Sequence, residues 1–424
     1  MFTFKAREQD RQGWGNTALI TAGQWICMAA LLLGGMLGEG LSLGGVAFCV
    51  IIGVLILLAC ACFMGAQSAK SGLPSTVASA NGLGVRGARC IPALLISIAS
   101  VGWFGVQAAA YGASFSVMVE EALGVSLPAW ASTLFWGFGI GIFAMQGYRA
   151  LLHFYCITAP ALFAVVVYTL IQTVFVSETP VLLAWRPAEP MSYIKGITLV
   201  VGSWAMGAYV VGDYCRYAKS PRTAVLGISA GIIVMPVMVL AGAAFRIVTG
   251  TSDIAVILNG IGYPAMALIF LILSAWAVNV MNAYFGGIAL SVLLGFEEKR
   301  LKLSSLLIAC IGTVLGAAGI LLRFMDFLSI LSSLAPPLIG TLAGVAITGL
   351  PGRGRKGEPG IPGKFAGRAV RPGFHIPGIV AYALGAFTAW LSAGALPFFI
   401  PPLNGILAAA AVYVILEKLF PLRN

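Results

Sequence analysis

Twelve long apolar runs, separated by charged or Gly/Pro-rich stretches, constrain the fold of this chain more than any other feature. They span residues 16–40, 44–67, 91–118, 127–147, 150–175, 194–217, 222–249, 262–293, 302–321, 326–349, 375–395 and 398–418. An apolar stretch of about 20 residues is long enough for a helix that crosses a bilayer. Hydrophobic residues make up 60% of the chain and charged residues only 9%, which is too little charge to cover a soluble protein of this size. The sequence therefore predicts an all-α polytopic membrane protein with about 12 transmembrane helices.

The basic residues are divided unequally between the two sides that these helices imply. With the N-terminus inside, 21 of the 25 Lys and Arg residues fall in inside segments, and only Arg186, Lys195, Arg246 and Arg323 fall outside. Positive loops resist translocation, so this division predicts a multi-pass protein of the cell (cytoplasmic or inner) membrane with both termini in the cytoplasm. It also accounts for the net charge of +11 without a nucleic-acid partner.

Two Gly-polar-Trp triplets suggest an internal repeat. Gly23-Gln24-Trp25 lies in the first apolar run and Gly202-Ser203-Trp204 lies in the sixth, so the two are five helices apart. Interrupted helices at corresponding places in two halves are typical of transporter binding sites, because unwound backbone inside a membrane must face a substrate, an ion or water. We therefore expect a five-plus-five inverted repeat with both helices broken at these triplets. The alternative is that the glycines only permit close helix packing.

The expected domain organisation follows from this repeat. A cytoplasmic N-terminus, a ten-helix core in two halves, a Gly/Pro-rich basic loop and a pair of peripheral helices with a short C-terminus follow one another along the chain. Their boundaries are residues 1–15, 16–349 (halves 16–175 and 194–349), 350–374 and 375–424.

Polar side chains in two other runs predict what the site binds. Ser100, Trp103 and Gln107 lie on one face of the third helix. Polar groups of the eighth run lie deep in its apolar stretch: Ser274, Trp276, Asn279 and Asn282. Buried amides need a partner or a cavity. Together with Trp204 they suit a flat, uncharged, polar ring, because indoles stack on its faces and amides bind its edge. No charged residue is expected at this level, which argues against amino acids or phosphates as substrates.

Four short motifs resemble those of one family of transporters. They are VGWFGVQ at Val101–Gln107, VGSW at Val201–Trp204, GDYCRY at Gly212–Tyr217 and APPLIG at Ala335–Gly340. In order and spacing they are similar to the nucleobase:cation symporter-1 (purine-cytosine permease) family, and within it to the cytosine permease branch. The similarity runs from Trp14 to the last helix. It implies a leucine-transporter-like core of ten helices plus two peripheral helices, and transport by alternating access.

The resemblance also implies a substrate site. Its residues come from four helices: Gln24, Ser100, Trp103, Gln107, Ser203, Trp204, Asn279 and Asn282. A base would be sandwiched between Trp103 and Trp204, and would contact an amide from either of the two asparagines of the eighth helix. The third-helix amide matches Ser100 in cytosine permeases and Gln107 in hydantoin-type relatives, so this chain has a mixed character.

The sodium site that the family implies is incomplete in this chain. Backbone oxygens at the first break match Gly23 and Cys27, and Ser274 is the remaining hydroxyl of the eighth helix. Two hydroxyl residues of the family align with Ala277 and Val278, which have no side-chain oxygen. Because a hard cation needs several oxygen ligands, we expect weak or absent sodium coupling at this degenerate site. Proton coupling or facilitated transport would replace it. No cofactor is expected, and the coupling cation is a proton or sodium.

Asp213 and Arg216 lie three residues apart near the inner end of the sixth helix. This spacing allows an ion pair that latches an inner gate, although such a pair at a helix end can also be purely structural. Proton coupling, if it replaces sodium coupling, would use an acid such as Asp213. Glu39, near the outer end of the first helix, is expected to be a solvated loop residue.

These features favour a secondary transporter that imports a nucleobase, either cytosine or a similar flat heterocycle. Purines, hydantoins and a hydroxymethylpyrimidine are alternative substrates, and an amino-acid carrier of the same architecture is a more distant alternative. An intramembrane enzyme would need a metal cluster or a catalytic dyad, and a channel would need rings of like residues. The sequence shows neither pattern, and its eight cysteines include no CxxC pair. The expected partners are the base and the lipid bilayer, and we expect a monomeric functional unit without catalytic residues.

Overall fold

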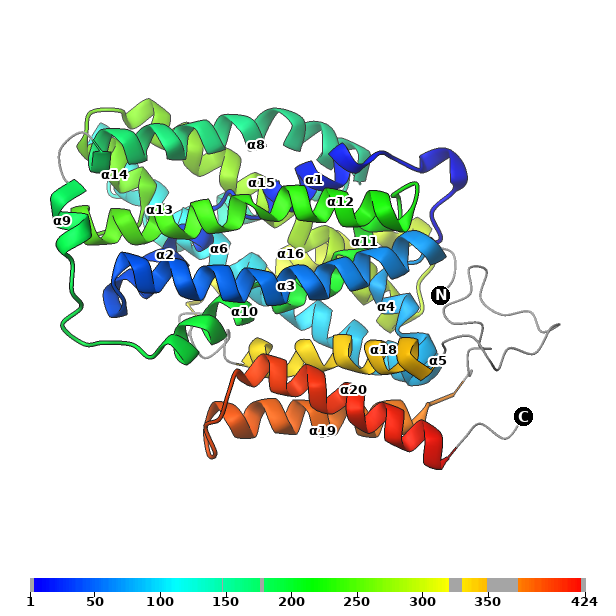
Figure 1. Cartoon of the computed structure of the whole chain (residues 1–424). Coiled ribbons are helices and arrows are strands. Elements are labelled where there is room, and N and C mark those ends of the chain that lie inside the picture. Colours follow the sequence, from blue (N-terminus) through cyan, green and yellow to red (C-terminus); the bar gives the residue numbers. More distant parts are fainter. Residues whose placement is uncertain (1–3, 147, 176–178, 320–329, 349–372, 421–424) are drawn as a thin grey trace.

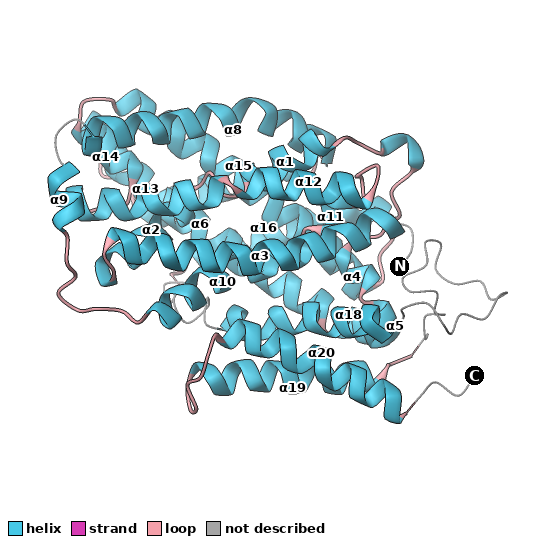
Figure 2. Ribbon diagram, viewed as in Figure 1, coloured by secondary structure: helices cyan, strands magenta, loops and turns pink. Residues whose placement is uncertain are grey.

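Helices form almost all the regular structure of the chain (Figures 1 and 2). The computed structural model describes residues 4–146, 148–175, 179–319, 330–348 and 373–420. The α-helices are α1 (Trp14–Gly23), α2 (Met28–Gly40), α3 (Leu43–Ser71), α4 (Ser75–Ala78), α5 (Ala80–Cys90), α6 (Pro92–Leu123), α7 (Ala129–Ala144), α8 (Tyr148–Leu170), α9 (Thr179–Ala184), α10 (Tyr193–Val210), α11 (Gly212–Cys215), α12 (Pro221–Ile232), α13 (Val234–Thr249), α14 (Ile254–Gly260), α15 (Pro264–Leu294), α16 (Leu301–Ala317), α18 (Pro336–Thr348), α19 (Ile376–Ala393) and α20 (Pro401–Leu419). Short 3-10 turns η2 (Glu8–Asp10) and η4 (Glu298–Arg300) and a π-helical turn η3 (Ile171–Phe175) complete the described elements.

The apolar runs of the sequence coincide with these helices over their described residues. Among the described residues, ten helices are long and apolar enough to cross a membrane, and the bent pair α1 and α2 makes an eleventh crossing. The run at 127–147 corresponds to α7, which has only 16 residues. A helix of that length spans about 24 Å, less than the roughly 30 Å of a bilayer core. The all-α polytopic architecture is therefore confirmed, whereas helix length alone supports eleven crossings rather than twelve.

The ends of the long helices follow their capping residues. The Ser192 hydroxyl accepts a hydrogen bond from the Lys195 N–H (3.3 Å) and begins α10. Proline occupies the first position of α6 and of α15, where its missing N–H has no helical partner to lose. Gly124 and Gly295 end the same two helices with φ of 67° and 74°, a left-handed conformation that only glycine adopts without strain.

The five-plus-five repeat is visible in the pairs of helices that pack together. The first span of each half packs against the second span of the other half: α1 and α2 contact α12 and α13, and α10 contacts α3. The two third spans, α6 and α15, contact each other, and so do the two fourth spans, α7 and α16. Each contact made by a helix of one half is thus also made by the corresponding helix of the other half, as the predicted repeat requires.

The first span is broken at the predicted place. α1 ends at Gly23, α2 begins at Met28, and the two helices are bent by 57°. Cys27 between them is extended, with φ −149° and ψ 162°. Four residues of the chain, Gln24 to Cys27, thus leave the helix in the middle of an apolar run.

The predicted break in the sixth span is wrong. α10 is helical from Tyr193 to Val210, straight through Gly202-Ser203-Trp204. Ser203 Oγ donates to the Val200 carbonyl one turn earlier (2.7 Å), a bond that a helix accommodates. A Cβ atom on Gly207 would lie 2.0 Å from Trp204 Nε1, so this glycine provides space for the indole. Gly207 therefore makes room for a side chain, and the backbone remains helical through the triplet.

Two further helices flank the core. α19 and α20 lie together along one side of the molecule, with α20 against α18 and α19 against α5 (Figure 1). The start of α1 and the end of α20 lie at the same end of the bundle. The predicted basic loop at 350–374 falls almost entirely outside the described residues.

At this same end, the N-terminal segment (residues 4–13) is docked onto the helices. The Ala6 N–H donates to the Gly72 carbonyl (2.8 Å). Arg11 Nη1 donates to three carbonyls, one in the last turn of α3 and two just after α11: Ala69 (2.7 Å), Arg216 (3.1 Å) and Ala218 (2.9 Å). Phe4 is fully buried in a small cluster with Leu73, Val77, Ala93 and Val292. The segment therefore connects the ends of the second, sixth and eighth spans.

At the opposite end, Glu39 differs from the prediction of a solvated loop residue. It lies in the last turn of α2, and its Oε1 is 2.7 Å from Arg246 Nη2 of α13. Both side chains are well exposed, at 56% and 40%, so the pair contributes at most about 1 kcal/mol. The correction follows from α2 continuing to Gly40, which brings Glu39 beside the end of α13.

Candidate substrate site

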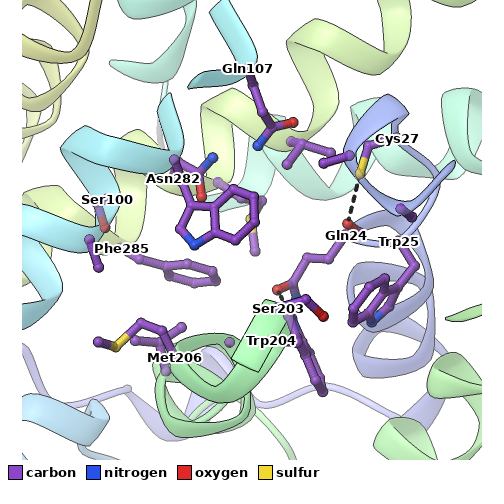
Figure 3. Close-up of a pocket in the computed structure, with 18 of the residues that line it drawn as sticks. Gln24, Trp25, Cys27, Ser100, Gln107, Ser203, Trp204, Met206, Asn282 and Phe285 are labelled. Carbon is purple, nitrogen blue, oxygen red and sulfur yellow. Dashed lines mark hydrogen bonds between the residues drawn. The ribbon is translucent and has the colours of Figure 1, made fainter. Parts of the chain in front are cut away.

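A cavity of about 90 Å³ lies at the break of the first span, between α2, α6, α10 and α15 (Figure 3). Seven of the eight residues expected in a substrate site line it: Gln24, Ser100, Trp103, Gln107, Ser203, Trp204 and Asn282. Figure 3 shows Gln24, Trp25 and Cys27 on one side, with Ser100 and Phe285 opposite. The fold thus gathers side chains from four helices that are separated by up to 258 positions in the chain.

Trp204 forms a fixed wall of this cavity. Its Nε1–H donates to Gln24 Oε1 (3.3 Å), so an indole from α10 is held by the first break. The Trp25 ring packs edge-on against it, with centroids 5.5 Å apart and planes at 61°. Only 7% of Trp204 is exposed, whereas Trp103, on α6, is half-buried. The two predicted stacking residues therefore border one cavity from different helices.

The two asparagines of α15 have different places. Asn279 is fully buried, and its Nδ2 donates to the Phe104 carbonyl (3.3 Å). Its Oδ1 then accepts from Asn282 Nδ2 (3.2 Å). A backbone carbonyl only accepts, so Asn279 must donate to Phe104 and accept from Asn282. These two hydrogen bonds fix the orientation of the Asn282 amide and leave its oxygen facing the cavity. Asn282 lines the cavity, and Asn279 orients it from behind.

Gln107 is oriented in a similar way. The Tyr111 hydroxyl, one turn further along α6, donates to Gln107 Oε1 (3.4 Å). The amide NH₂ of Gln107 then supplies hydrogen-bond donors on the cavity side (Figure 3). The cavity therefore presents a donor from Gln107 and an acceptor from Asn282, with the hydroxyls of Ser100 and Ser203 at its border.

Sequence reasoning missed several apolar lining residues. Met206, Met281 and Phe285 reach the cavity, but they stand in apolar runs, and Trp25 was named only as part of the break. Phe285 alone had a usable signal, because it follows Asn282 by three residues and so lies on the same helical face. Among the described residues that line the cavity, none is charged. The arrangement can bind a neutral ring by stacking and by hydrogen bonds to its edge.

A tyrosine of α8 lies beside the residues expected to hold sodium. A Cβ atom on Gly23 would lie 2.2 Å from two ring carbons of Tyr155, so the α8 tyrosine lies directly on the first break. The Tyr155 hydroxyl donates to the Ala277 carbonyl of α15 (2.7 Å), and Tyr155 is fully buried. Ser274 Oγ donates to the Leu271 carbonyl within its own helix (3.3 Å), and Cys27 Sγ contacts the Gln24 carbonyl (3.7 Å). A phenol therefore fills the space between the first break and α15.

Asp213 and Arg216 do not form the predicted latch. Asp213 Oδ1 accepts from the Ser75 N–H (2.8 Å), the first residue of α4. Arg216 Nη2 donates to the hydroxyls of Tyr217 (2.8 Å) and Tyr284 (3.1 Å), and its Nη1 donates to the Phe4 carbonyl. Within the described ranges, no ion pair joins the two side chains. The i,i+3 spacing permits a pair, but segments distant in sequence provide other partners for both groups.

Comparison with known proteins finds a matching family and similar relatives. The family described as "Permease for cytosine/purines, uracil, thiamine, allantoin" matches residues 5–352. The cytosine permease of Escherichia coli K12 is 28% identical over 334 residues, which cover 78% of this chain and 77% of the relative. A putative allantoin permease of the same strain is 26% identical over 243 residues, 52% of this chain and 50% of that protein.

Solved structures share the fold. A nucleobase-cation-symport-1 family transporter, in a closed conformation with bromovinylhydantoin bound, has a TM-score of 0.79 at 18% identity and covers 100% of this chain and 97% of its own. A Na+-coupled sialic acid symporter has a TM-score of 0.71 at 12% identity, with 99% and 94% coverage. At such low identities the likeness shows the architecture alone.

Proposed function

Because this chain belongs to the family of permeases for cytosine/purines, uracil, thiamine and allantoin, we propose that it imports cytosine or a similar flat, uncharged heterocycle across the cell membrane. Family and fold identify a nucleobase-type transporter that works by alternating access, and not an enzyme. The observation that carries the finer proposal is the cavity at the first break. It combines three indoles, three amides and two hydroxyls, with no charged side chain among the described lining residues.

Each part of this cavity matches a feature of a nucleobase. The faces of the ring stack against Trp103 and Trp204, since indole and heterocycle both carry flat π-systems. The Gln107 NH₂ donates to a ring nitrogen or carbonyl, and Asn282 Oδ1 accepts from an amino group or ring N–H. Cytosine carries such acceptors and donors side by side on one edge. A charged substrate would lack a counter-ion here, and its desolvation would be costly.

We further propose that sodium does not drive this transport. The Tyr155 ring occupies the space beside Gly23, and its hydroxyl donates a hydrogen bond to the Ala277 carbonyl. A hard cation needs several oxygen ligands in place of its water shell. An ion can shift an alternating-access equilibrium only through different affinities for the two states, so a chain without a sodium site gains no bias from sodium.

Uptake by the purified protein in liposomes tests the proposed substrate class. We expect saturable uptake of labelled cytosine, competed by unlabelled flat heterocycles and not by amino acids. The panel should include purines, hydantoins and hydroxymethylpyrimidine, because the best competitor identifies the substrate within the class. Competition by amino acids but not by any heterocycle would contradict the proposal.

Replacing Gln107 with Leu is expected to change the ranking of the competing bases. The variant removes the donor of the cavity, so a base acceptor that it bound is left unpaired at a cost of about 1–3 kcal/mol. Bases that lack this acceptor lose less, and inhibition constants for the panel measure the difference. Gln67→Leu makes the same change in α3 away from the cavity and should leave the ranking unchanged. An equal loss for all bases with Gln107→Leu would indicate damaged folding and would speak against selection by this amide.

A further inference from the structure

The substrate site leaves one group of buried polar atoms unused, at the end of the bundle where the N-terminal segment docks. Asp213 is fully buried in α11, and its Oδ1 accepts the single hydrogen bond from Ser75 already described. Its Oδ2 is also buried and has no hydrogen-bond partner. The same is true of two nearby hydroxyl oxygens, Ser68 Oγ at the end of α3 and Thr76 Oγ1 beside Ser75. Ser68 Oγ lies against the backbone of Gly212, where a Cβ atom would be only 2.1 Å away.

A carboxylate in this position is incompletely satisfied. An ionised carboxylate accepts several hydrogen bonds, and its burial without them costs several kcal/mol. Arg216 does not provide the missing contacts, because its Nη atoms bond to Phe4, Tyr217 and Tyr284. A proton on Oδ2 removes the buried charge and converts the oxygen into a donor, for which a hydroxyl oxygen is a suitable acceptor. The positive Arg216 opposes this by favouring the ionised form, so the carboxyl group is suited to both binding and releasing a proton.

The neighbourhood contains other ionisable groups. On α11 and the elements packed around it they include Cys62 and Lys70 of α3, Tyr209 of α10, Tyr214 and Cys215 of α11 itself, Arg216, Tyr284 of α15 and Arg11 of the N-terminal segment. Glu8 and Asp10 of the N-terminal segment also carry carboxyl groups, but neither is buried, whereas Asp213 is fully buried. The hydroxyl of Tyr209 is engaged with Ser79 and with the Ser75 carbonyl (3.3 Å).

We propose that the Asp213 carboxyl group binds the proton that is transported together with the heterocycle. The inference rests on the proposed function and identifies its coupling ion. A proton needs one oxygen, whereas a metal cation would need several oxygen ligands beside the guanidinium of Arg216. The proton forms an O–H bond at Oδ2 when the site faces outward and leaves to water when the inner end opens, so no bond of the substrate is made or broken.

Contacts connect Asp213 to the cavity. Val210 lines the cavity, and Asp213 follows it by three residues, about one helical turn. The neighbouring Tyr214 stacks on Phe285, another lining residue, with centroids 6.1 Å apart and planes at 27°. The Tyr214 hydroxyl is 2.9 Å from the Thr21 hydroxyl of α1. Substrate in the cavity and a proton on Asp213 therefore both act on the contact between the first and sixth spans, where Tyr214 meets Thr21.

Asp213→Asn tests the proposal, because the amide imitates the protonated carboxyl group but cannot release a proton. In liposomes without sodium, with the interior alkaline and the membrane potential clamped, the unaltered protein should accumulate labelled cytosine by up to about tenfold per pH unit. In the variant, the cytosine concentration inside should rise only to that outside, while exchange of labelled for unlabelled cytosine continues. Asp253→Asn, at the opposite end, changes a matched carboxylate that caps α14 and should retain accumulation. Asp213→Glu keeps a carboxyl group and should retain part of the accumulation.

A second measurement does not depend on transport. The infrared carbonyl band of a protonated carboxylic acid should be present in the unaltered protein and absent from Asp213→Asn, with Asp253→Asn unchanged. Accumulation by Asp213→Asn under the pH gradient, or the same infrared band in that variant, would overturn the proposal. Accumulation by the unaltered protein with sodium but not with a pH gradient would overturn it too. If the unaltered protein bound and moved no heterocycle in any condition, the proposed function itself would fail, which the competition panel detects separately.

Discussion

Trp103→Ala is expected to weaken the apparent affinity for the transported base by roughly tenfold or more. Trp103 is half-buried at the border of the cavity, so its removal costs one stacking face without emptying the protein core. An aromatic pair contributes about 1 kcal/mol beyond the buried area, and each 1.4 kcal/mol corresponds to a factor of ten. The concentration of cytosine that gives half-maximal uptake measures the loss.

Trp204→Ala should show the same loss together with a lower stability. Its indole is bonded to Gln24 and packed on Trp25, and truncation of a buried aromatic side chain costs about 3–5 kcal/mol. Trp390→Ala is the matched control, because Trp390 is 61% exposed on the peripheral helix α19 and borders no part of this cavity. If Trp103→Ala and Trp204→Ala are well expressed and transport with unaltered affinity, the substrate binds elsewhere.

An imposed sodium gradient at fixed pH is expected to give no accumulation of the base above equilibration. The Tyr155 side chain fills the place between Gly23 and Ala277, and the eighth span has no side-chain oxygen at Ala277 or Val278. The measurement is uptake of labelled cytosine into liposomes with external sodium, compared with the same liposomes in potassium. Strong accumulation with sodium alone would refute the proposed absence of a sodium site.

A gain of function follows from the same geometry. Adding hydroxyls alone, with Ala277→Thr and Val278→Thr, leaves the tyrosine in place and should produce little response. Combining both changes with Tyr155→Ala opens the space and supplies oxygens, so this variant should respond to sodium. Tyr155→Phe combined with the two threonines is the control, since the ring stays on Gly23 and only its hydroxyl is lost. Equal sodium responses of the Phe and Ala combinations would show that the ring does not block the site.

The spans, the first break and most of the candidate site could be predicted because each depends on local pattern. Hydropathy identifies the crossings, and a period of 3.6 residues places Ser100, Trp103 and Gln107 on one face. The Gly-Gln-Trp triplet indicates the break at Gly23. The similar triplet at Gly202 misleads, because a glycine in a sequence has two meanings, an unwound backbone or room for a neighbour. At Gly202 the structure decides between them, because α10 stays helical through the triplet.

What the sequence could not reveal was which groups from distant segments meet. The partners of Arg216 come from the N-terminal segment and from α15, so spacing within α11 had no bearing on them. Tyr155 lies in an apolar run with no polar pattern around it, and its contact with Ala277 spans 122 positions. Asn279 and Asn282 were indistinguishable as neighbours on one helix until the Phe104 carbonyl separated the orienting amide from the lining one.

The crossed packing of the two halves has a consequence for how such a chain can arise and assemble. The first helix of each half is covered by the second helix of the other half, and the two third helices cover each other. A half produced alone would leave the unwound backbone at Gln24–Cys27 facing lipid, where peptide groups without partners cost several kcal/mol each. A half-length ancestor with this packing would thus have required a second copy inserted upside down in the same membrane. Translation of one long chain supplies both copies together, in equal number and opposite orientation.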